Sequence, residues 1–91
     1  MPLGTLPGHD LVAAGIRDLT AGVESEPALL VSIGAPRLAR LGFAVGNPLP
    51  NPEHRLYELL ASIDRASAHS RYNALVRRLV SFERAAECVH P

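Results

Sequence analysis

Apolar residues recur three and four positions apart along most of the chain, which is the spacing of side chains that share one side of an α-helix. No stretch alternates apolar and polar residues for long enough to predict a convincing strand. Glycines and prolines interrupt the apolar pattern and mark the ends of its segments. The pattern therefore predicts an all-α fold, a small bundle of four to five helices.

The first predicted helix covers residues 10–21. Its N-cap is expected at Asp10 or His9, where a polar side chain can satisfy a free backbone N–H group. Gly22 follows as a left-handed stop. The apolar side of this helix consists of Leu11, Val12, Ile16 and Leu19.

A second helix is predicted to begin after Ser25, because serine is a capping residue and Pro27 is tolerated in a first turn. Its expected buried side consists of Leu29, Leu30 and Ile33. Pro36 disfavours helical geometry at the residue before it, which predicts a break there. A short third helix is expected at residues 36–41.

Residues 42–51 predict one long Pro-rich connection between the third and fourth helices, because proline favours extended backbone. Asn51 is the expected cap of the fourth helix, with Pro52 in its first position. A fifth helix is expected to restart at Ser67 or Ser70 and to run to about Cys88. No glycine or proline precedes this restart, so the pattern leaves open whether helices four and five are separate or one bent rod.

A heptad-like seam runs along the predicted fifth helix: Tyr72, Leu75, Leu79, Phe82, Ala86 and Val89. Such a seam is typical of a helix that pairs with a second copy of its chain or with another helical protein. In a parallel pair, Arg78 would face Glu83 of the second copy. The same stripe is also typical of a helix that packs on its own chain, and fewer than three heptads favour this second interpretation. Both can hold when a partner completes a small core.

The formal net charge of zero argues against general attraction to nucleic acid or to an anionic membrane. All nine basic residues are arginine, so mechanisms that need a lysine of this chain are excluded. Residues 65–84 nevertheless hold five arginines against one acid. A candidate surface for nucleic acid or another anion consists of Arg71, Arg77, Arg78 and Arg84. The alternative is a solvated face that pairs with Glu58 and Asp64 of the fourth helix.

Few residues suggest other chemistry. His69 lies in the densest polar cluster, residues 67–73, where it could carry protons, but helix capping by Ser67 or Ser70 is the stronger interpretation. Cys88 and His90 form an isolated pair that does not make a metal site, so no metal or cofactor is predicted. A buried Glu83 would need a partner, for which Arg78 and His90 are the candidates.

A length of 91 residues suits a single domain, which we expect at residues 9–91 behind a flexible arm at 1–8. The chain has one cysteine and no run of apolar residues long enough for a membrane span or a signal peptide, so we expect a cytoplasmic protein. The sequence predicts a small non-catalytic module for protein–protein contact, most simply a homodimer. Binding of nucleic acid or another anion is the alternative.

Overall fold

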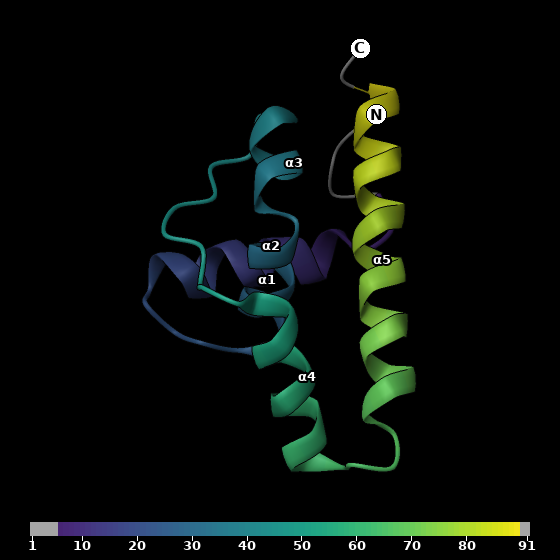
Figure 1. The fold of residues 1–91 in the computed structure, drawn as a ribbon. Coiled ribbons are helices and arrows are strands. Elements are labelled where there is room, and N and C mark those ends of the chain that lie inside the picture. Colours follow the sequence, from purple (N-terminus) through teal and green to yellow (C-terminus); the bar gives the residue numbers. More distant parts are fainter. Residues whose placement is uncertain (1–5, 90–91) are drawn as a thin grey trace.

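The structure, a computed structural model, describes residues 6–89 and contains five helices and no strand in that range (Figure 1). They are α1 (His9–Thr20), α2 (Glu26–Ile33), α3 (Ala35–Arg40), α4 (Pro52–Ile63) and α5 (Ala68–Val89). The all-α prediction is therefore confirmed, with helix bounds within two residues of those expected. Helices four and five are separate elements.

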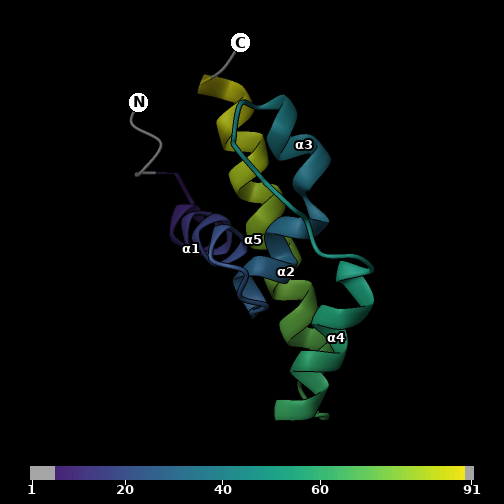
Figure 2. The ribbon, with the colours of Figure 1, turned by 90° about the vertical axis from the view of Figure 1, so that its left-hand side faces the viewer.

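The longest helix, α5, forms one side of the molecule. In Figures 1 and 2, α4 runs beside its N-terminal part and α3 beside its C-terminal part. The α1 helix crosses this arrangement, and α2 lies in the centre (Figure 2). Helix α2 contacts all four other helices, so it is the element around which the bundle is arranged.

Helix α2 is buried all round. Its residues 28–31 have no exposed surface, and Ser32 is also buried. A helix that is apolar on every side is stable only when neighbours cover it completely. The predicted buried side was therefore too narrow, and Ile33, which was part of it, is only half-buried because it lies at the edge of the core. The predicted cap is confirmed: the Ala28 N–H group donates to Ser25 Oγ at 3.2 Å.

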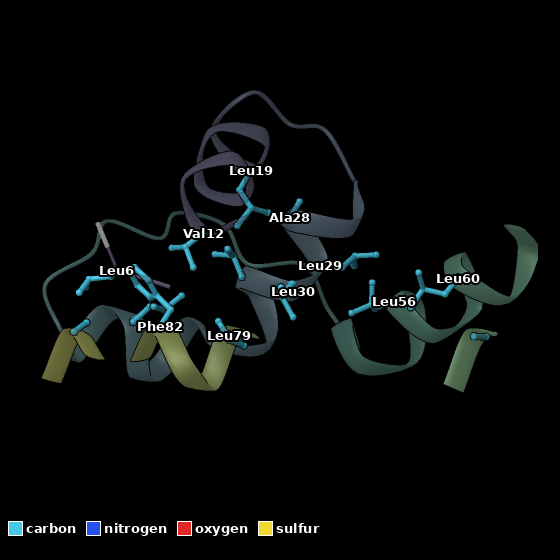
Figure 3. Close-up of a cluster of buried hydrophobic side chains, with 14 residues drawn as sticks. Leu6, Val12, Leu19, Ala28, Leu29, Leu30, Leu56, Leu60, Leu79 and Phe82 are labelled. Carbon is cyan, nitrogen blue, oxygen red and sulfur yellow. The ribbon is translucent and has the colours of Figure 1, made fainter. Parts of the chain in front are cut away.

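The core combines leucines from all five helices with Phe82 of α5, and Figure 3 shows the side chains of α1, α2, α4 and α5 that meet there. Leu6 also belongs to this cluster and is buried. We expected a flexible arm at residues 1–8, but the packed structure already includes Leu6. Residues 1–5 of that arm lie outside the described part of the chain.

One predicted cap is wrong, and another is right in its position only. Helix α1 follows Gly8, which has φ of 78° and therefore a left-handed conformation that glycine adopts readily; neither His9 nor Asp10 caps it. Asn51 precedes α4 as expected, but it is also left-handed, with φ of 48°, and its side chain makes no capping hydrogen bond. In both places the backbone, rather than a polar side chain, sets the entry to the helix. The left-handed stop at Gly22 is confirmed by its φ of 75°.

The long connection between α3 and α4 is held against the core by one buried hydroxyl. Ser32 Oγ donates to the Ala28 carbonyl at 2.8 Å and accepts from the Leu49 N–H group at 3.0 Å. The turn between α4 and α5 is held by Asp64, whose carboxylate accepts from Ala66 N–H at 3.1 Å and from Ser67 Oγ at 2.9 Å. These local bonds explain why the chain turns here without glycine or proline.

Helices α1 and α2 touch through their backbones at Gly15. A Cβ atom added to Gly15 would lie 2.3 Å from the Pro27 carbonyl oxygen and 2.4 Å from a methyl group of Val31. Neither neighbour can yield easily, because Pro27 contributes rigid backbone and Val31 is fully buried. Only glycine permits this crossing.

We predict that Gly15→Ala lowers the free energy of unfolding by about 2 kcal/mol, because the added methyl group overpacks the crossing. Circular dichroism should show a melting temperature about 10 °C lower. Gly46→Ala is the control, since nothing lies within 4 Å of that position and its φ is not positive. A Gly15→Ala chain that is more stable by about 1 kcal/mol, as helix propensity alone would give, would contradict the close crossing.

Candidate functional site

The predicted seam of α5 faces the core of its own chain. Leu79, Phe82 and Ala86 are 3%, 0% and 0% exposed, respectively. The other seam residues, Tyr72, Leu75 and Val89, are half-buried and pack against the same core. Pairing of this seam with a second chain stays a prediction. The central residues of the seam are already covered by the core of their own chain.

The arginines of α5 divide into two groups. Arg71 pairs with Glu26 of α2 at 3.5 Å, and Arg78 pairs with Asp10 of α1 at 3.4 Å. The expected partners on α4 were therefore wrong, because this side of α5 faces α1 and α2. Arg77 and Arg84 are exposed and form no ion pair among residues 6–89.

A groove of about 270 Å³ opens between the end of α2, α3 and α5, and we call it the α3–α5 groove. Its lining is Ile33, Gly34, Pro36, Arg37, Arg40, Val76, Leu79, Val80 and Glu83. Apolar side chains form most of this lining, and charged side chains border it. The groove was not predicted, because it joins residues of α2 and α3 to residues of α5 that lie far away in the sequence.

A buried carboxylate lies in the groove. Glu83 is only 4% exposed, and its Oε1 atom lies 3.5 Å from Nη1 of Arg37. Nη2 of Arg37 also lies 3.0 Å from Oε1 of the exposed Glu87. Burial of Glu83 follows from its place near the apolar seam. Arg78 was the wrong candidate partner, because it pairs with Asp10, and the other candidate, His90, lies outside the described residues. The guanidinium group of Arg37 therefore forms ion pairs with two carboxylates, those of Glu83 and Glu87.

Gly34 allows the corner between α2 and α3 to lie against α5. A Cβ atom at this position would lie 2.8 Å from Glu83 Oε2 and 3.1 Å from Leu79 Cδ2. A side chain here would push α3 away from α5 or displace the carboxylate. Gly34 therefore sets how closely the two walls of the groove approach.

Burial raises the pKa of the Glu83 carboxyl group above its ordinary value of 4.5. The positive charge of Arg37 opposes this rise, and the negative charge of Glu87 adds to it. Burial is the largest of the three causes, so the pair with Arg37 compensates the lost hydration of Glu83 only in part.

We predict that Glu83→Gln removes the loss of folding stability that ionisation of the Glu83 carboxyl group causes as the pH rises. Because the folded-state pKa of Glu83 is raised, its contribution is fully favourable below about pH 4.5 and is lost as the pH rises through the folded-state value. Urea unfolding from pH 4 to pH 7 should therefore show wild-type chain losing stability relative to Glu83→Gln as the pH rises. Glu87→Gln, which removes the exposed partner of the same guanidinium, should retain that loss. A wild-type chain that gains stability relative to Glu83→Gln over this range would contradict the assignment.

Two further hollows lie elsewhere on the described surface. One, of about 310 Å³, is lined by His9, Val12, Ala13, Ile16, Arg17, Phe43 and Phe82. Two of these residues, Phe43 and Phe82, pack against each other with their ring centroids 5.3 Å apart. The other lies along α4 and is lined by Tyr57, Glu58, Ala61, Ser62 and Arg65. Neither hollow contains a buried charged group like Glu83.

The cluster around His69 does not form an enclosed site. His69 is exposed and lines none of the three hollows. Its Nε2 atom lies 3.3 Å from Nδ2 of Asn73, and its ring packs on Tyr57 with centroids 6.4 Å apart. Tyr72 completes this aromatic group, and burial, followed by the charge of Glu53, raises the pKa of its hydroxyl.

The described residues offer few features of other functional classes. Residues 6–89 contain no group of three or more His, Cys, Asp or Glu side chains placed to hold a metal ion. Within the same range, no helix combines the length and the apolar character needed to cross a membrane. Comparison of the chain with protein-family models, curated proteins and solved structures found no match.

Proposed function

We propose that this chain is a small non-catalytic helical module that acts by protein–protein contact, and that the α3–α5 groove is its contact surface. The observation that carries the proposal is the apolar lining of the groove, which remains open after the seam of α5 has been used in the core. Apolar hollows bordered by charged residues are typical of surfaces that receive a partner.

The shape of the groove favours a helical partner. Val76, Val80 and Glu83 follow one another along α5 and span about 10 Å, or two turns. Pro36, Arg37 and Arg40 of helix α3 line the opposite wall. An amphipathic helix binds such a groove through apolar residues spaced three and four positions apart. The hollow lined by Phe43 also presents a strip of one helix, because five of its seven lining residues belong to α1, but only Phe43 and Phe82 complete it, and it contains no carboxylate.

A homodimer through α5 is one form of this proposal. Leu79, Phe82 and Ala86 are covered by the core, so a second copy would have to bind through the neighbouring groove. The nucleic-acid alternative is weaker, because Arg71 and Arg78 are already paired with carboxylates of their own chain. Phosphate binding would have to compete with those pairs.

We predict that Val80→Asp abolishes binding at the groove. Panning a displayed library of randomised helical peptides against the wild-type chain should enrich binders whose affinity falls at least about tenfold with Val80→Asp, because a charge then occupies the apolar wall. Val23→Asp is the matched control, since Val23 is 49% exposed and lies outside the groove. Thermal melts must show that both variants are folded, and Val80→Ser provides a milder second change.

Enriched peptides that bind Val80→Asp and wild type equally would overturn the assignment of the groove, as would the absence of any enrichment. Sedimentation at about 100 µM tests the homodimer in the same protein. A dimer that Val80→Asp dissociates would support the contact function and identify a second copy as the partner.

A further inference from the structure

Three arginines surround the α3–α5 groove without an ion pair. Arg40 lines the groove on α3. Arg77 and Arg84 lie three positions before and four positions after Val80 on α5, so they flank this groove residue on the helix surface. None of the three forms an ion pair among residues 6–89.

The carboxylates nearest to these arginines are already engaged. Glu83 and Glu87 both pair with Arg37, whose single positive charge offsets one of their two negative charges. Four arginines and two carboxylates thus border or line the groove, and the excess charge is positive. An incoming partner would meet this excess on both sides of the apolar lining.

The lining itself favours protein over nucleic acid. It contains isoleucine, proline, valine and leucine but no aromatic ring on which a base could stack. Apolar side chains of this kind are covered best by apolar side chains of a partner. Guanidinium groups at the border bind carboxylates with fixed, often bidentate geometry.

A second copy of the chain is a poor match for the same surface. A two-fold contact brings one patch against itself. Two α3–α5 grooves placed face to face would bring Arg40, Arg77 and Arg84 of one copy near the same arginines of the other. Like charges at an interface cost free energy and suppress such pairing.

From these contacts we infer that the α3–α5 groove binds an acidic amphipathic helix of another protein, with apolar residues on Val76 and Val80 and carboxylates on Arg40, Arg77 and Arg84. The inference rests on the proposed contact function and specifies its partner. Charge complementarity sets the choice of partner, and the apolar strip supplies the contact area.

Three labelled peptides of about 18 residues test the inference. They share the same apolar residues at helical spacing and carry Glu, Gln or Lys at the flanking positions. Fluorescence anisotropy against the full chain at about 50 mM salt should show the Glu peptide binding about tenfold more tightly than the Gln peptide, and the Lys peptide most weakly. The preference should shrink at about 300 mM salt, because exposed pairs are screened.

The triple variant Arg40→Gln, Arg77→Gln and Arg84→Gln should lose the preference for Glu and retain the affinity for the Gln peptide. The matched control is Arg17→Gln with Arg65→Gln, which removes two arginines that line the other hollows and form no ion pair among the described residues. The control should keep the full preference.

Other results would overturn either the acidic partner, the protein partner or the contact function itself. If the Glu and Gln peptides bind equally and both are lost with Val80→Asp, the acidic partner is wrong and the contact function stands. If no peptide of any charge binds in a Val80-dependent manner, the contact function itself fails. Tighter binding of a mixed-sequence DNA or RNA at the same salt, lost in the triple variant, would replace the protein partner with nucleic acid. Self-association that Val80→Asp removes would replace it with a second copy.

Discussion

The complete burial of the middle of α2, residues 28–31, is the constraint on which the rest of this structure depends. Eight residues make a helix of only two turns, and such a helix is held by packing rather than by its own hydrogen bonds. Because residues 28–31 expose nothing, every direction around α2 must be filled by another element. Helix α1 closes one side at Gly15, where only glycine allows the backbones to touch. Helices α4 and α5 cover the remaining sides, and Ser32 ties the long connection to the end of α2.

This constraint decides which face of α5 remains outside the core. The core takes Leu79, Phe82 and Ala86, so the seam that could pair with another helix is occupied by its own chain. The neighbouring face, which includes Val76 and Val80, meets α3 only across the groove. Glu83 lies at the border between these two faces. Its side chain is buried, and its carboxylate pairs with Arg37 in the groove. The α3–α5 groove, which is the proposed contact surface, therefore follows from the way α5 packs into the core.

Local features of this fold could be predicted from the sequence, and features that depend on helix order could not. The helix at Glu26–Ile33 begins where Ser25 caps it, so its start can be predicted from a few adjacent residues. The break between α2 and α3 was predicted at Ala35, but it lies at Gly34, and Ala35 is helical although proline follows it. The partners of Arg71 and Arg78 depend on which helices flank α5, and apolar spacing within a helix does not contain that information. The groove was missed for the same reason: its lining residues come together only after α3 packs beside α5.

A net charge of zero therefore conceals an uneven distribution that packing creates. On the side of α5 that faces α1 and α2, acids of those helices neutralise Arg71 and Arg78. On the side that faces α3, Glu83 and Glu87 share Arg37, and Arg77 and Arg84 form no ion pair in the described structure. If the groove binds an acidic helix as proposed, the same excess of arginine would repel a basic one, and both effects would contribute to specificity. Arginine suits this role better than lysine, because its stem covers apolar surface while its planar head holds a carboxylate in one orientation.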